Sequence, residues 1–220
     1  MRAGAPATNP FGPAPAGVRL RMALVRHGET DASVRGRCCG SLDPPLSEEG
    51  RRQMQRTRGL VQGLAASAVY ASPRQRALES ARILRLDAPI AIDDRLQEID
   101  FGLLEGLTYQ DVAERFASVW RLWMQQPANV VFPQGEPFDV FSDRVEEARA
   151  ELIERHHGDA IVVVAHGGVN RLILARALGL ELRGMFRLQQ TCGAVSVVDF
   201  YDGTAVLQVL NATWRVATQC

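Results

Sequence analysis

The sequence predicts an α/β fold: one domain with a mostly parallel central sheet, flanked by helices on both faces. Short apolar runs typical of buried strands alternate along the chain with longer segments whose apolar residues recur at helical spacing. Two of these runs, "MALVRHGET" at 22–30 and "VVVAHGG" at 162–168, end on a histidine followed by a glycine. The length of 220 residues suits one such domain and does not require a second.

The first element follows a stretch of unusual composition. Residues 1–20 are rich in proline, alanine and glycine and have no apolar core, which predicts a disordered leader at 1–20 and a folded domain at 21–220. The apolar run 19–25 then predicts a buried strand. That strand delivers Arg26 and His27 at its carboxyl end.

Two helices are expected in the next part of the chain. Ser47 is a suitable N-cap for a helix over 48–64. The segment 68–84 predicts a strand, a turn and a helix, with Ser72 as the N-cap. Arg76 then falls in the first helical turn, where a cation opposes the helix dipole. This placement indicates that an anion binds nearby.

The second half of the chain predicts a helical insertion and a return to the sheet. The segment 96–127 is mainly helical, and we expect it to lie over the active site. An amphipathic helix is predicted over 138–157, followed by a buried strand, a two-glycine turn and a helix over 160–180. Two strands within 194–211, joined by a turn, predict a hairpin at the sheet edge.

The two strand-end histidines are the strongest indication of function. A lone histidine is usually structural, but in a parallel sheet ligands bind at the carboxyl ends of the strands, which brings His27 and His166 to the same crevice. Gly167 opens a helix, whose free N–H groups favour an anion. Together with Arg26 and Arg76, this set suits a phosphoryl group, because a guanidinium matches phosphate oxygens with a planar pair of donors.

Composition excludes several other classes. The 25 basic and 25 acidic residues give a net charge of +0, so no nucleic-acid partner is expected. Every basic residue is an arginine, which excludes a Schiff-base lysine and a Walker-type phosphate loop. The four histidines and four cysteines show no ligand spacing, so we expect no metal and reduced thiols in a cytoplasmic protein. No apolar run approaches the roughly 20 residues that span a membrane.

Five segments in order resemble the histidine phosphatase superfamily, which includes cofactor-dependent phosphoglycerate mutase. The resemblance extends from about Arg21 to Asn211, whereas "RHG" alone would be weak. The matching segments are "LVRHGET", "GSLDPPLSEEG", "ASPRQRALESA", "LQEIDFGLLEG" and "VVVAHGGVNRLILARALGL".

This resemblance implies a role for each matching residue. His27 would be the nucleophile, Arg26 and Arg76 would hold the phosphoryl oxygens, and His166 would complete the pocket. Glu98 would be the proton donor, kept protonated by partial burial. Should Glu98 only shape the pocket, Glu105 and Glu136 are the next candidates for the acid.

Four further residues are expected to contact substrate by the same resemblance: Ser33, Cys39, Gly40 and Gly167. Ser33 stands where many members have asparagine, and its hydroxyl can still donate a hydrogen bond. Cys39 is either a less polar substrate contact or a buried small apolar residue.

Three segments are similar to those of the α-ribazole phosphatases: "CCGSLDPPL", the tryptophan-containing segment before "PQGEPF", and "GTAVLQVLN". They imply hydrolysis of α-ribazole 5′-phosphate in cobalamin biosynthesis. No cofactor is expected. The expected partners are a small phosphate ester and a second copy of the chain in a possible homodimer. Trp120 and Trp123 are either core residues or stack on an aromatic base. The alternatives are a broad-specificity sugar-phosphate phosphatase, a phosphoglycerate mutase and, less favoured, a non-enzymatic pseudophosphatase.

Overall fold

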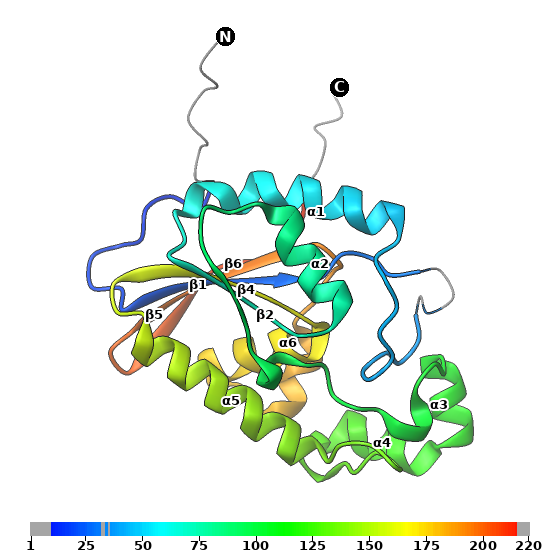
Figure 1. Cartoon of the computed structure of the whole chain (residues 1–220). Coiled ribbons are helices and arrows are strands. Elements are labelled where there is room, and N and C mark those ends of the chain that lie inside the picture. The colour runs from blue at the N-terminus through cyan, green and yellow to red at the C-terminus, as the bar shows by residue number, and fades with distance from the viewer. Residues whose placement is uncertain (1–9, 32–33, 35, 215–220) are drawn as a thin grey trace, which may run out of the picture.

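One six-stranded sheet with helices on both faces dominates the computed structural model, which describes residues 10–31, 34 and 36–214 (Figure 1). The strand order is β3-β2-β4-β1-β5-β6; the first four strands pair in parallel, and β5 and β6 are antiparallel. The predicted α/β class is therefore confirmed. The strands are β1 (Leu20–Arg26), β2 (Ala68–Ala71), β3 (Ile90–Ile92), β4 (Asp159–Ala165), β5 (Val195–Tyr201) and β6 (Thr204–Ala212).

The two faces of the sheet bury separate apolar clusters. Side chains of β1 alternate between them, because successive residues of a strand point to opposite faces. Val25 belongs to the cluster beneath the first two helices, and Leu24 belongs to the cluster beneath the later pair. Figure 1 shows the four covering helices: α1 (Glu48–Val61) and α2 (Gln75–Leu84) on one face, α5 (Phe138–Arg155) and α6 (Gly167–Ala177) on the other.

The predicted helix starts are confirmed in one case and wrong in the other. The Ser47 side chain accepts a hydrogen bond from the Gly50 amide and caps α1, as expected. Ser72 does not cap α2, whose N-cap is Arg74 in an extended conformation. The Ser72 hydroxyl instead lies 2.8 Å from Nε2 of His166. The hydroxyl that the local pattern predicted as a helix cap therefore forms a hydrogen bond with a histidine far away in the sequence.

The expected helical insertion is present as α3 (Tyr109–Arg115) and α4 (Ala117–Gln125). Thr108 caps α3 in a capping box with Asp111. Trp123 joins the apolar cluster on the α5/α6 face, which fixes the insertion to the domain. Figure 1 shows the insertion near the end of the sheet to which β1 points.

The sequence predicted the strand at one edge of the sheet but not the strand at the other. The expected hairpin is confirmed, with β6 at one edge. The opposite edge is β3, which was not predicted. All three of its residues are exposed, so no pattern of buried apolar residues marks this strand in the sequence.

The described part of the expected leader, residues 10–20, contacts the domain and includes the first residue of β1. Phe11 packs against the apolar cluster on the α1/α2 face. The Gly12 carbonyl accepts a hydrogen bond from Arg21 over 2.7 Å. The first strand begins at Leu20. Residues 1–9 lie outside the described part. Within the described residues, none of the helices has the length and apolar character needed to cross a bilayer.

Candidate active site

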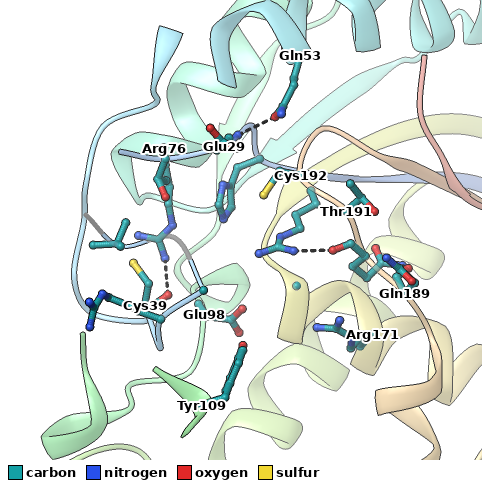
Figure 2. Close-up of a pocket in the computed structure, with 18 of the residues that line it drawn as sticks. Glu29, Cys39, Gln53, Arg76, Glu98, Tyr109, Arg171, Gln189, Thr191 and Cys192 are labelled. Carbon is teal, nitrogen blue, oxygen red and sulfur yellow. Dashed lines mark hydrogen bonds between the residues drawn. The ribbon is translucent and has the colours of Figure 1, made fainter. Parts of the chain in front are cut away.

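The two strand-end histidines meet above the centre of the sheet. His27 directly follows β1 and His166 follows β4, and these strands are parallel neighbours. Their rings lie edge to face, with centroids 5.1 Å apart. His27 and both arginines expected to hold the phosphoryl oxygens line a cavity of about 620 Å³ at this end of the sheet (Figure 2). The spatial proximity predicted from the strand ends is therefore observed.

The His27 ring is held in one tautomer. Its Nδ1 lies 2.7 Å from the carbonyl oxygen of Gly28, which can only accept a hydrogen bond, so Nδ1 carries the proton. Burial, followed by the charges of Arg26 and Arg76, lowers the pKa of His27 well below its usual 6.5. The ring is therefore neutral at neutral pH and carries its free electron pair on Nε2. A neutral imidazole with a free Nε2 is a competent nucleophile.

His166 is buried beside His27 and does not itself line the large cavity. Its Nε2 pairs with the Ser72 hydroxyl, which also accepts a hydrogen bond from the Arg74 amide. Its Nδ1 is buried without a partner among the described residues. Burial, then the charge of Arg76, lowers the pKa of His166 well below its usual value. An unpaired buried nitrogen next to His27 is suited to an oxygen of a bound group.

The two arginines are oriented by backbone carbonyls. Arg26 Nη1 donates to the carbonyl of Gln190. Arg76 is fully buried, and its terminal nitrogens donate to the carbonyls of Cys39, Gly40 and Leu42 over 2.6–3.2 Å. Carbonyl groups do not neutralise a guanidinium, and the Asp43 carboxylate reaches Arg76 Nη1 only at 3.4 Å. The two cations therefore retain their attraction for an anion in the cavity.

Glu98 approaches the first turn of α6. One carboxylate oxygen accepts from the Gly168 amide over 2.9 Å, and the other accepts from the adjacent Ile99 amide. A Cβ at position 168 would lie only 2.3 Å from a Glu98 oxygen, so glycine is required there for this approach. Glu98 lines the same cavity as His27. Whether it is protonated in the reaction stays a prediction.

Glu105 has a different role from the one considered for it. Its carboxylate accepts hydrogen bonds from the amides of Gly40, Ser41, Leu42 and Phe101 over 2.9–3.2 Å, and it does not line the cavity. The carbonyls of this same loop orient Arg76. Glu136, the other candidate, forms a two-pronged ion pair with Arg144 outside the cavity. Of these three candidate carboxylates, Glu98 is therefore the one that lines the cavity with His27; Glu29, which the sequence analysis did not consider, lines it as well.

The loop contact of Glu105 leads to a testable prediction. Glu105→Gln replaces one acceptor oxygen by an NH₂ group that faces backbone donors, so the loop and Arg76 shift. We expect kcat/KM for an alkyl phosphate to fall by about 10- to 100-fold, since a 1 Å misplacement can cost about 10²-fold. Steady-state kinetics check this, together with the dissociation constant for vanadate, which should rise in parallel. Glu147→Gln, at a carboxylate that is 72% exposed, is the matched control. Unchanged kinetics in Glu105→Gln would contradict the positioning role.

Of the four further residues expected to contact substrate, the structure places two in the lining of the cavity. Cys39 lines the cavity, and its thiol donates to the Leu42 carbonyl over 3.4 Å. Gly167 also lines the cavity. Gly40 does not: its amide binds Glu105, and a Cβ there would lie 1.8 Å from the Ile99 carbonyl oxygen. Its glycine is required by packing. Ser33 lies outside the described residues.

Several cavity residues were missed by reasoning from the sequence. Figure 2 shows Tyr109 from α3 beside Glu98, and Arg171 from α6 on the other side of the cavity. Burial lowers the pKa of Arg171 and raises that of Tyr109. Arg171 lies one helical turn after Gly167, so the i, i+4 spacing could have pointed to it. Gln190, which binds Arg26, carries no signal in the sequence.

The fold and the site define a protein with a buried neutral histidine at a strand end, set between cations and a carboxylate. The family model described as "Histidine phosphatase superfamily (branch 1)" matches residues 22–213. The chain belongs to this superfamily.

Individual relatives are similar over nearly the whole chain. The adenosylcobalamin/alpha-ribazole phosphatase of Escherichia coli is 33% identical over 195 residues, covering 88% of this chain and 96% of that protein. The alpha-ribazole phosphatase structure from Shigella flexneri superposes with a TM-score of 0.77 at 33% identity, over 87% of this chain and 96% of that one. A bifunctional protein of Mycobacterium tuberculosis is 36% identical over 90% of this chain, which spans only 55% of that relative's length.

Proposed function

We propose that this protein is a phosphomonoesterase that acts through a phosphohistidine on His27. The observation that carries the proposal is the state of the His27 ring: Nδ1 is held by the Gly28 carbonyl, and the ring is neutral between two arginines. Nε2 is then free to attack phosphorus. Phosphoryl transfer spreads negative charge over the oxygens, so positioning and fixed cations can supply most of the catalysis.

The first step breaks the ester. Nε2 of His27 forms a bond to phosphorus while the bond from phosphorus to the ester oxygen breaks. Glu98 gives its proton to that oxygen, which leaves as an alcohol. Arg26 and Arg76 hold the phosphoryl oxygens, and each has an Nε–H group without a partner among the described residues. The Ser72 hydroxyl accepts from the Arg74 amide and can direct its own proton to Nε2 of His166, so the His166 proton lies on Nδ1, which has no partner among the described residues. We propose that this proton is donated to a phosphoryl oxygen.

The second step restores the enzyme. Water attacks phosphorus, Glu98 takes a proton from the water, and the bond from phosphorus to His27 breaks to release inorganic phosphate. The guanidinium groups supply the charge that a metal ion provides in other phosphatases, so activity in the presence of excess chelator is expected. The pseudophosphatase alternative is disfavoured, because every position needed for both steps is filled.

For the substrate we propose α-ribazole 5′-phosphate. The support is the likeness of nearly the whole chain to relatives named for that activity, in Escherichia coli at 33% identity and in Salmonella typhimurium at 32%. The segment between Glu98 and residue 133 forms two short α-helices, α3 and α4, and two single-turn 3₁₀ helices. Phosphoglycerate mutases have a longer insertion there that helps to bind a second phosphate group, so the short segment favours hydrolysis over a mutase reaction.

A panel of phosphate esters tests the proposal. We expect α-ribazole 5′-phosphate to have a higher kcat/KM than 3-phosphoglycerate, phosphoserine and simple sugar phosphates, with inorganic phosphate released in excess chelator. Rapid interconversion of 3- and 2-phosphoglycerate would instead indicate a mutase. Similar kcat/KM values across the panel would indicate the broad-specificity alternative.

A further inference from the structure

A second, smaller cavity opens from the site of phosphoryl transfer. Its volume is about 230 Å³, which equals the liquid volume of about eight water molecules and is room for one or two aromatic rings. It shares five lining residues with the large cavity: Glu98, Phe101, Tyr109, Arg171 and Phe186. The two spaces are therefore continuous at Glu98. A substrate group that extends from the phosphorus at His27 past Glu98 would enter the smaller cavity.

Aromatic side chains form the walls of this second cavity. Trp123 is buried and packs against Phe101, with ring centroids 5.5 Å apart. Trp120 stands perpendicular to Trp123 at 5.9 Å, and Tyr109 lies 6.3 Å from Trp120. Phe186 contributes from a separate segment of the chain, 6.2 Å from Trp123. Trp123 is thus a core residue, as one of the two interpretations held, while Trp120 is only half-buried and available to a ligand.

The charges of the second cavity lie where it meets the first. Glu98 and Arg171 line both spaces, and the other lining residues are aromatic, aliphatic or glycine. An additional anion would lie against aromatic faces at the far end, which is unfavourable. A planar aromatic ring fits there, because stacking on exposed aromatic faces favours it and no buried polar group is left unpaired.

We infer that this cavity, the aromatic subsite, binds a planar aromatic group carried by the leaving alcohol of the substrate. The inference rests on the proposed phosphatase reaction at His27. It assigns Trp120 as a specificity-determining residue. The ring stacks beside Trp120 while the ester oxygen stays at Glu98, so the aromatic group gains binding energy without altering the chemistry of the bond that breaks.

Two esters with equivalent leaving groups test this: 2-phenylethyl phosphate and n-butyl phosphate. Both release a primary alkoxide, so a difference in kcat/KM reports the ring. We expect the wild-type enzyme to prefer the phenylethyl ester by about tenfold or more. Trp120→Ala should remove most of this preference, because kcat/KM for the phenylethyl ester should fall by a much larger factor than kcat/KM for the butyl ester. Trp120→Phe keeps an aromatic face and should retain most of the preference.

A matched control lies against α1 and lines neither cavity. Trp214 packs on Gly59 of α1, so Trp214→Ala should leave both esters unaffected. Turnover of both esters without a ring preference, or equal losses for both in Trp120→Ala, would overturn the subsite. If the proposed phosphatase function itself were wrong, the result would be different, because the wild-type enzyme would then hydrolyse neither ester.

Discussion

His27→Ala is expected to lower kcat by at least about 10⁴-fold and to abolish the covalent phosphoenzyme. Alanine removes the nitrogen that attacks phosphorus while leaving the arginines in place, so phosphate binding persists without turnover. Rapid quenching with labelled substrate should trap a phosphate on the wild-type enzyme that is labile in acid and stable in base, as expected for a phosphoramidate. The variant should show none.

The matched control is His157→Ala, because His157 is exposed and lies at the opposite end of the sheet from the cavity. It should retain full activity and the full phosphoenzyme signal. Label on a serine or cysteine, or undiminished label in His27→Ala, would refute the mechanism. Equal Tm values for the two variants in thermal unfolding would show that the loss does not come from misfolding.

Glu98→Gln is expected to slow hydrolysis in a substrate-dependent way. Glutamine keeps the size and the acceptor oxygen but has no proton to give. An alkyl phosphate leaves as a strongly basic alkoxide, so its phosphorylation step should slow by about 10²–10⁴-fold. Nitrophenolate is a much weaker base and needs little help, so formation of the phosphohistidine from nitrophenyl phosphate should be far less affected.

Breakdown of the intermediate supplies the second readout. Water attack needs the same carboxylate as a base, so Glu98→Gln should accumulate phosphohistidine on nitrophenyl phosphate. Single-turnover phosphorylation and dephosphorylation rates for both esters measure the two steps separately. Equal losses for both substrates without accumulation would mean that Glu98 only shapes the pocket. Glu105 and Glu136 would not replace it readily, because their carboxylates already bind backbone amides and Arg144.

Most of the proposed catalytic set was accessible to sequence reasoning because its members lie at recognisable local positions. His27 and His166 end apolar runs, and the rule that parallel strands present ligands at their carboxyl ends brings the two together. The helix with Arg76 in its first turn was also correctly expected, although its cap was not. Ser72 matched a local capping pattern, yet its hydroxyl pairs with His166, 94 residues away.

Other features depend on partners that no local pattern connects. Arg21 lies inside an apolar strand, where a charged side chain is unfavourable without a partner. In the fold, the register of β1 and β5 sets Arg21 opposite Asp199, 178 residues away, and the two form a buried ion pair through two hydrogen bonds of 2.6 and 2.7 Å. A buried charge requires such a partner. The sequence shows both residues but not their pairing.

By itself the sequence determined the α/β class, the order of most elements, and which histidines, arginines and carboxylate to propose for the site. The class, the elements and the strand-end histidines follow from periodicity, short motifs and one topological rule, whereas Glu98 follows from the resemblance of its segment to the family. Only the tertiary structure decided that Glu105 holds the loop which orients Arg76, and that Trp120 and Phe186 enclose a cavity next to Glu98. The physical reason is that such contacts join segments far apart in the chain, and their geometry exists only once the sheet register and helix packing are set.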